Sequence, residues 1–532
     1  MYIVADFPRS SQTAQRIFAQ IRVEFPSPFD FSLALLSAFL LILSFPDFDL
    51  WPLAWIALIP LLLSVSRRRS PVHGLILGWM TGSVFFYGTC YWLTFSMINY
   101  GNIPGGIAYL LLVPGALVVG LFPGLFALML AVAMRRMHTT ALLLAPFVWT
   151  SFEWARLGVT GQLWNALGYS QAYQPWLIQS ARWGGVYAIG FFIVSTNSVL
   201  TYALVKRDKR AVYVTLAVIS LVALLVLTSS WQSSISPEIT PTAQLVAVQP
   251  NVPMHLQKST AEMQELTVRH VVMTEAALQT LPHDRYPRIV IWPESPMNFT
   301  YAGSSVFREF VTTFARTHRT SVLFNSQEPA PSHGIYNSAM LVNEEGRLVR
   351  QYDKIRLLPF GEYVPIPRWL PGANLITAIV GDFEAGANYT LIPIGEANAG
   401  VFICIESAYP SIARQFARDG AEVLINISND GYLGRTAVMR QHLANAIFRA
   451  VENARPVVRV TNTGITTYIE ADGKLRDQTP AFEPATRTWT VARTGTGQTT
   501  YTRFGDLFAI LSSFVTALLG LWSIAGWRRT MI

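Results

Sequence analysis

Long apolar runs alternate with short polar or aromatic connections through the first 230 residues of the chain. One further apolar run lies close to the C-terminus. The fourth run contains Pro114 and Pro123, which predict a kink or a re-entrant piece because proline removes a helical hydrogen bond. The pattern predicts a polytopic α-helical membrane bundle of about eight spans, with seven spans and one re-entrant segment as the alternative. The expected spans are residues 31–46, 51–66, 74–96, 105–134, 139–155, 183–205, 211–230 and 505–527.

Residues 231–504 show a different pattern, in which short strand-like apolar runs alternate with helical ones. The apolar runs are continuous, which is typical of strands buried on both faces of a sheet in an α/β domain. In such sheets functional groups collect beyond the carboxyl ends of the strands. Helices are expected at about 260–281, 304–318, 409–419 and 436–454. The expected strands are Gln244–Val248, Arg288–Trp292, Ser321–Asn325, Ala339–Val342, Gly400–Ile403, Val423–Ile427, Val457–Val460 and Thr466–Glu470.

The composition fits a membrane protein with one soluble part, since hydrophobic residues make up 51% of the chain and charged residues only 14%. A net charge of +8 can indicate a nucleic-acid partner, but here the basic residues cluster just after apolar runs. With the N-terminus inside and eight spans, every cluster lies on the cytoplasmic side, as the positive-inside rule requires. We therefore expect no nucleic-acid partner. The clusters are Arg67–Arg69, Arg135–Arg136, Lys206–Arg210 and Arg528–Arg529.

This topology divides the chain into four parts. Residues 1–30 form a cytoplasmic segment that has no long apolar core, so we expect no cleavable signal peptide. Residues 31–230 form seven transmembrane helices, and 231–504 form an extracytoplasmic domain. Residues 505–532 form the last transmembrane helix and a short cytoplasmic tail. The only two cysteines are Cys90, in an apolar run, and Cys404, so no disulfide framework is expected.

Three candidate chemical groups occur in the soluble part, and two of them follow strand-like runs. Cys404 ends the run VFIC, Glu294 follows RIVIWP, and Lys354 opens the stretch KIRLLPFGEY. Alone, each has an ordinary explanation: a buried core thiol, a solvated loop acid, and a lysine that extends to water. Together they supply the nucleophile, the proton carrier and the cation that acyl transfer needs. A lysine beside the thiol would also lower its pKa.

The ordered set WPE, YDKIRLLPFGEY and CIE resembles the nitrilase superfamily, whose members use a Glu–Lys–Cys triad on an αββα sandwich. Within it, the apolar runs and the phrases FGEYVP, ISNDGYLG and RPVVRVTNTGIT are similar to the apolipoprotein N-acyltransferase family. The resemblance implies that Glu294 is the general base, Lys354 the cation that stabilises the oxyanion, and Cys404 the nucleophile.

The same resemblance implies supporting roles for three neighbours of the triad. Glu362 would orient Lys354, Glu406 would support the surroundings of the thiol, and the N–H of Ile405 would complete the oxyanion hole. Three positions depart from the family pattern. Ile405 stands where tyrosine is frequent, and Tyr432 and Lys258 stand where tryptophan is expected. These departures affect lipid contacts and leave the triad intact.

Several aromatic and apolar residues are candidates for substrate binding. The Pro-stiffened stretch VPIPRWLP carries Trp369 and Leu370, which would enter the bilayer or, alternatively, pack on the domain. Tyr363 precedes this stretch, and Trp164 lies in an outside segment that resembles a family stretch near the site or serves as an interfacial anchor. His442 and Arg449 share a helical run with Glu452, which indicates structural pairing. No metal-ligand spacing occurs, and no cofactor is expected.

The resemblance implies a membrane acyltransferase with a ping-pong mechanism. It would move an acyl chain from a phospholipid, through a Cys404 thioester, to the N-terminal amine of the diacylglyceryl-cysteine of apolipoproteins. We expect a monomer in the bacterial inner membrane with its catalytic domain on the periplasmic side. One alternative is a membrane-tethered amidohydrolase of nitrilase type, with water as second nucleophile. The other is a non-enzymatic module that binds lipoproteins, against which the complete triad argues.

Overall fold

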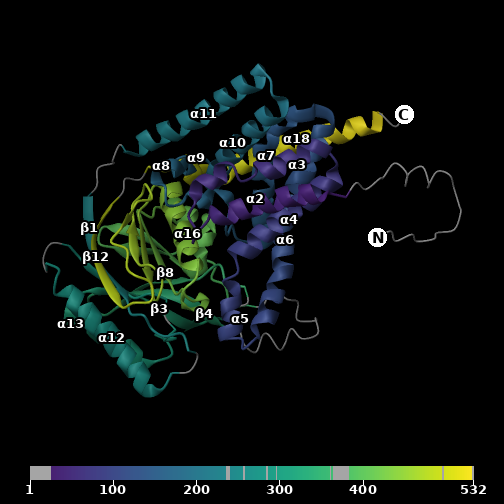
Figure 1. Cartoon of the computed structure of the whole chain (residues 1–532). Helices are drawn as coiled ribbons and strands as arrows, with labels where there is room; N and C mark the ends of the chain where they lie inside the picture. Colours follow the sequence, from purple (N-terminus) through teal and green to yellow (C-terminus); the bar gives the residue numbers. More distant parts are fainter. Residues whose placement is uncertain are drawn as a thin grey trace.

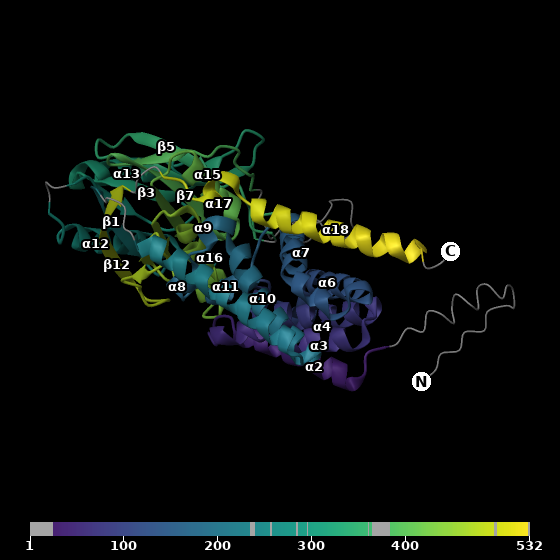
Figure 2. The same ribbon diagram turned by 90° about the horizontal axis from the view of Figure 1, so that it is seen from above.

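A computed structural model describes residues 25–234, 240–255, 258–282, 286–294, 296–359, 361–363, 383–493 and 497–529. Figure 1 shows two parts that lie side by side, one of helices and one of β-sheets with helices beside them. From residue 25 the chain forms the helical part, then both sheets, and returns to the helical part with its last helix, α18 (Leu507–Arg529). In Figure 2, α18 runs away from the sheets along the helical part.

The expected spans overlap helices of the structure, but their bounds differ and some expected spans contain more than one helix. Of the described helices, three segments are long and apolar enough to cross a membrane: Gly105–Thr160, Val186–Lys206 and Lys209–Trp231. Pro28–Leu43 and Leu507–Ser523 are shorter apolar helices. The α-helices of this part, besides α18, are α2 (Pro28–Leu43), α3 (Ile59–Arg68), α4 (Pro71–Thr89), α5 (Leu93–Asn99), α6 (Gly105–Met137), α7 (Ala145–Thr160), α8 (Pro175–Ile178), α9 (Ala181–Gly184), α10 (Val186–Lys206) and α11 (Lys209–Ser234). Both prolines lie inside α6, which is nevertheless a continuous helix. The re-entrant piece that the prolines suggested is therefore absent from this segment.

Small residues bring α4 and α6 into close contact. A Cβ atom added at Gly78 of α4 would lie 2.4 Å from the backbone oxygen of Pro123, and one added at Gly120 of α6 would lie 2.5 Å from the backbone nitrogen of Ser83. Both distances are too short for any side chain, so glycine is required at these two positions. Small residues at such spacing allow membrane helices to pack backbone against backbone.

The basic clusters at the ends of α3 and α6 meet at one end of the helical part. Arg135 donates a hydrogen bond to the carbonyl of Arg69, and Arg136 lies over the ring of Trp522 near the end of α18. Arg68 lies 3.4 Å from Asp30 at the start of α2. The start of α2 and the ends of α3, α6 and α18 therefore share one side of the bundle.

Two six-stranded sheets form the other part, and they share one design. In each, three parallel strands occupy the middle and antiparallel strands flank them. The orders are β12-β1-β2-β3-β4-β5 and β11-β10-β9-β8-β7-β6. The strands are β1 (Thr240–Gln249), β2 (Arg288–Ile291), β3 (Ser321–Pro329), β4 (Ile335–Val342), β5 (Leu348–Asp353), β6 (Leu391–Ile394), β7 (Ala397–Ile403), β8 (Val423–Ser428), β9 (Val457–Thr461), β10 (Thr467–Ile469), β11 (Leu475–Arg476) and β12 (Ala485–Arg493).

Alternate residues of the central strands enter two different hydrophobic cores. In β2, Ile289 and Ile291 belong to a core that also contains Val401 and Ile403 of the second sheet. Val290 instead belongs to a core shared with helices on the opposite face of the first sheet. This alternation follows from the period of two of a β-strand, and it explains why the strands are apolar on both faces.

The four expected helices of this part are present as α12 (Thr260–Leu278), α13 (Ser305–His318), α15 (Pro410–Arg418) and α16 (Val438–Asn453). The helices α12 and α13 pack on the first sheet, and α15 and α16 on the second. Helix α16 lies between the second sheet and the membrane helices (Figure 1). This placement connects the two parts close to the strand ends where the candidate residues lie.

Candidate active site

Cys404 stands at a sharp turn between a strand and a short helix. It follows β7 directly and is the first residue of the 3₁₀ helix η4 (Cys404–Ala408). Its φ angle is 53°, in the left-handed region that residues other than glycine rarely adopt. Such backbone strain is found mainly at functional sites, because the surrounding structure has to maintain it. The turn therefore favours a functional role for Cys404 over that of a core thiol.

Glu294 lies three residues after β2, so its carboxylate comes from the other sheet. The side-chain amide of Asn337 donates to one carboxylate oxygen at 2.9 Å, and the backbone N–H of Asn429 donates to the other at 3.1 Å. The Cys404 thiol also hydrogen-bonds to Glu294. The carboxylate is thus oriented by two fixed donors and directly contacts the thiol.

Lys354 follows β5 and is buried between two carboxylates. Its Nζ atom lies 2.8 Å from Glu362 and 3.7 Å from Glu294, and only 1% of its side chain is exposed. Burial lowers the pKa of Lys354, but the charges of Glu362 and Glu294 raise it by more, so that it lies above its ordinary value. Lys354 is therefore a permanent cation, and the expected ion pair with Glu362 is present.

The titration of the thiol differs from what the sequence suggested. Burial raises the pKa of Cys404, and the negative charge of Glu294 raises it further, while Lys354 lowers it by less. Burial likewise raises the pKa of Glu294, an effect that Lys354 opposes. The expected lowering of the thiol pKa by the lysine is outweighed. The site holds a protonated thiol beside a carboxylate of increased basicity, an arrangement suited to proton transfer during attack.

Glu406 accepts hydrogen bonds that fix the segments around the triad. Its carboxylate accepts a hydrogen bond from the Tyr352 hydroxyl at 2.9 Å. It also accepts hydrogen bonds at 2.7–3.0 Å from the backbone N–H groups of Ile355, Arg356 and Ile403. Glu406 is fully buried. It therefore connects the turn at the nucleophile to the segment after Lys354, which agrees with a supporting position for this residue.

Sequence reasoning gave His442 only a structural pairing and did not single out Asp430. His442 lies 2.7 Å from Asp430 through Nδ1 and 2.9 Å from the carbonyl oxygen of Cys404 through Nε2. Asp430 also pairs with Arg459 at 2.7 Å. No spacing motif marks these residues, since they come from a loop, a helix and a strand. The polar residues NDG directly after a strand were the available signal. Arg449 pairs with Glu452 at 2.7 Å, as expected.

The candidate substrate contacts differ in burial, and two of them lie outside the described residues. Trp164 is buried and packs against His442, with ring centroids 5.6 Å apart. Tyr363 is 39% exposed. Trp369 and Leu370 lie outside the described residues, so their expected positions stay predictions. Tyr432 is 40% exposed, and burial together with the charge of Glu294 raises its pKa to about 12, which places it within electrostatic reach of the site.

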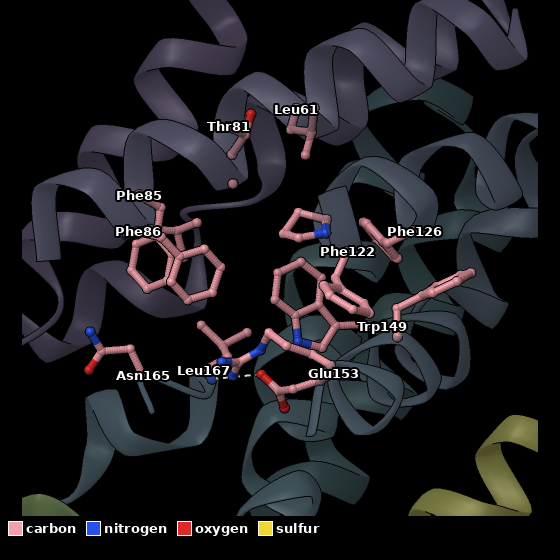
Figure 3. Close-up of a pocket in the computed structure, with 15 residues that line it drawn as sticks. Leu61, Thr81, Phe85, Phe86, Phe122, Phe126, Trp149, Glu153, Asn165 and Leu167 are labelled. Carbon is pink, nitrogen blue, oxygen red and sulfur yellow. Dashed lines mark hydrogen bonds between the residues drawn. The ribbon is translucent and has the colours of Figure 1, made fainter. Parts of the chain in front are cut away.

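A largely apolar pocket lies within the helical part, next to the segment that carries Asn165 and Leu167 (Figure 3). Phe85, Phe86 and Phe122 line its walls, and Glu153 lies at one end. Glu153 accepts a hydrogen bond from the backbone N–H of Leu167 at 2.8 Å. The pocket therefore combines hydrocarbon walls with a polar end that fixes the neighbouring loop.

Among the described residues, no group of three or more His, Cys, Asp or Glu side chains is arranged to hold a metal ion. The site itself supplies a thiol, a carboxylate hydrogen-bonded to it, and a buried ammonium group. This combination can form and resolve a covalent acyl intermediate.

Comparisons with known proteins cover both parts of the chain. The family model of the apolipoprotein N-acyltransferase N-terminal domain matches residues 37–199, and the carbon-nitrogen hydrolase model matches residues 243–501. The apolipoprotein N-acyltransferase of Geobacter metallireducens is 33% identical over 90% of this chain and 92% of its own. That of Thermotoga maritima is 30% identical over 92% of this chain and 94% of its own. A mutant amidase of the nitrilase superfamily from Nesterenkonia aligns with 51% of this chain and 97% of its own, with 14% identity and a TM-score of 0.36.

Proposed function

The chain belongs to the apolipoprotein N-acyltransferase family and acylates the N-terminus of lipoproteins, and we propose that it does so by a two-step exchange on Cys404. The observation that carries this mechanism is the convergence of Glu294, Lys354 and Cys404, which come from the ends of strands in two sheets. A nucleophile, a proton acceptor and a cation, with the proton acceptor paired to both other groups, are the parts that acyl transfer needs.

In the first step Glu294 removes the proton of the Cys404 thiol as the sulfur attacks an ester carbonyl of a phospholipid. The carbonyl oxygen becomes an oxyanion, which Lys354 and the backbone N–H of Ile405 stabilise. The carbon–oxygen ester bond then breaks, and Glu294 returns the proton to the departing oxygen. A lysophospholipid leaves, and the acyl chain remains on Cys404 as a thioester.

In the second step the α-amine of a diacylglyceryl-cysteine attacks the thioester. Glu294 accepts a proton from the amine, the carbon–sulfur bond breaks, and the Cys404 sulfur regains a proton. The product is an amide on the lipoprotein N-terminus. Both steps use the same oxyanion donors, and the lysophospholipid leaves before the acceptor binds, as in a ping-pong mechanism. No cofactor takes part.

The fold suits two substrates that are both anchored in a bilayer. We assign residues 1–30 to the cytoplasm, 31–230 and 505–532 to a bundle of eight spans with a short cytoplasmic tail, and 231–504 to an αββα domain on the periplasmic side of the inner membrane. The basic ends of α3 and α6 support this orientation, because cytoplasmic loops carry excess Lys and Arg. The site then meets its lipid substrates by lateral diffusion.

Four residues are proposed as substrate contacts. Tyr363, Trp369 and Leu370 are assigned to the entry of the acyl chain, and Trp164 to the wall of the site that faces the membrane helices. The exposure of Tyr363 and the contact of Trp164 with His442 support these positions. The protein is proposed to act as a monomer.

Transfer from a labelled phospholipid to a synthetic diacylglyceryl-cysteine peptide tests the proposed function. We expect the labelled acyl chain on the peptide amine, and plots of rate against one substrate at several levels of the other should give parallel lines, because the first product leaves before the acceptor binds. Mass spectrometry of the peptide measures the transfer. Release of free fatty acid at a rate unchanged by the peptide would instead indicate a hydrolase.

A further inference from the structure

The carbonyl group of Cys404 has a dedicated hydrogen-bond donor. His442 Nε2 lies 2.9 Å from this oxygen, and the imidazole is almost fully buried, with 3% of the residue exposed. Cys404 adopts the left-handed backbone conformation, which costs free energy unless neighbouring groups maintain it. A buried donor on the carbonyl of the strained residue is such a group.

The orientation of His442 is set from its other side. Its Nδ1 atom lies 2.7 Å from Asp430, whose second oxygen pairs with Arg459. Burial raises the pKa of Asp430, but Arg459 and His442 lower it by more, so Asp430 is ionised. A carboxylate and a carbonyl can both only accept hydrogen bonds. The Cys404 carbonyl oxygen cannot donate, so the hydrogen bond across this contact is donated by His442 Nε2.

The peptide that His442 holds also carries the proposed oxyanion donor. The carbonyl of Cys404 and the N–H of Ile405 belong to one peptide unit, and in a trans peptide these two groups point in opposite directions. Fixing the carbonyl on the His442 side therefore directs the Ile405 N–H to the other side. A hydrogen bond to the carbonyl also polarises the peptide and strengthens its N–H as a donor.

We propose, on the basis of the proposed function above, that His442 is a positioning residue that holds the peptide between Cys404 and Ile405 so that the Ile405 N–H faces the oxyanion. His442 contacts neither the substrate nor the sulfur in this role. It acts through the backbone of the nucleophile, and Asp430 and Arg459 hold it in place.

Gln441, the residue before His442, connects the start of α16 to the membrane helices. The side-chain oxygen of Gln441 accepts hydrogen bonds from the indole N–H groups of Trp92 at 3.0 Å and Trp164 at 2.9 Å. It also accepts one from Asn165, which lines the pocket of Figure 3, at 3.4 Å. Its amide nitrogen donates to backbone carbonyls of the helical part. The start of α16 is thus anchored on the membrane part at the position next to His442.

Three substitutions of His442 separate positioning from plain stability. In His442→Gln the amide N–H reaches the place of Nε2 and can still donate to the Cys404 carbonyl. In His442→Asn the shorter side chain reaches Asp430 only, and His442→Leu makes neither contact. Two rates are measured on each full-length protein: acylation of Cys404 by saturating phospholipid, and alkylation of Cys404 by iodoacetamide. Alkylation forms no oxyanion, so it does not need the Ile405 N–H.

We expect acylation to fall about 100-fold in His442→Leu and His442→Asn, the usual effect of losing one oxyanion donor. His442→Gln should stay within about tenfold of the unchanged protein. Alkylation should change less than about threefold in all three, and the KM for phospholipid should not move, because His442 does not touch the lipid. Leu443→Ala, which removes a buried side chain from the same helix, is the matched control, and it should affect both rates together.

Equal losses of acylation and alkylation in His442→Leu would overturn the proposal, because they would indicate a general loss of packing. The proposal would also be overturned if His442→Asn retained as much acylation activity as His442→Gln. Acylation at the same rate in the unchanged protein and His442→Leu would overturn only the proposed role of His442 and would leave the proposed function intact. Absence of any acyl adduct on the unchanged protein would instead overturn the proposed function, and this inference with it.

Discussion

Replacing Lys354 by Met is expected to lower acylation of Cys404 about 1000-fold, the upper range for the loss of one preorganised oxyanion partner. The ammonium group lies 2.8 Å from Glu362 and 3.7 Å from Glu294, and its side chain is buried. Its removal leaves two buried carboxylates without a cation, so Glu294 would take up a proton and lose its function as base. Single-turnover acylation followed by intact mass measures the effect.

Lys474→Met is the matched control for this substitution. Lys474 also pairs with a carboxylate, Asp472 at 2.8 Å, but its side chain is 64% exposed and far along the chain from the triad. An exposed pair of this kind contributes little to stability. We expect unchanged acylation in the control. Undiminished acylation in Lys354→Met would remove Lys354 from the mechanism.

Replacing Glu294 by Gln is expected to lower acylation about 1000-fold, within the range that general acid–base groups contribute. The glutamine keeps the shape of the side chain but cannot accept the thiol proton. Because the pKa of Cys404 is raised, mainly by burial, few thiolates exist near neutral pH to replace this function. Glu328→Gln is the control, since Glu328 is a buried carboxylate on the same sheet that binds backbone N–H groups of Tyr301 and Ala302.

The pH dependence of acylation follows from the same carboxylate. Burial is the largest cause that raises the pKa of Glu294, so it takes up a proton at a higher pH than an ordinary glutamate. The protonated form cannot accept the thiol proton, so the rate should fall as the pH is lowered through this raised pKa. Above it the rate should level off. Glu294→Gln should lose this dependence, and a rate that rises toward acid pH would contradict the role of Glu294 as base.

Two of the three proposed triad residues have a simple position in the chain, whereas Lys354 follows β5 and was singled out by the family resemblance. Glu294 and Cys404 directly follow continuous apolar runs, and strand ends are where functional groups collect in parallel sheets. All eight expected strands are present in the structure. The sequence did not reveal β5, β6, β11 and β12, which are short or contain alternating polar residues and lie at or near the sheet edges.

The environment of the triad was less predictable than its members. Whether Lys354 lowers the thiol pKa depends on how deeply Cys404 is buried and how close Glu294 lies, and both depend on the packing of two sheets. The contact between His442 and the Cys404 carbonyl joins residues 38 positions apart. The alternation of apolar residues in α16 gives no information about which polar residue faces that carbonyl, so such contacts come only from the assembled structure.

The intact mass of the purified protein after incubation with a defined phospholipid tests the central claim most directly, because it detects the thioester itself. Cys404→Ala is measured beside it. We predict a mass increase equal to one acyl chain that hydroxylamine removes and that Cys404→Ala does not show. If the thiol is reduced, lipid is present and no adduct forms, or if the adduct also forms on Cys404→Ala, the proposed mechanism is wrong.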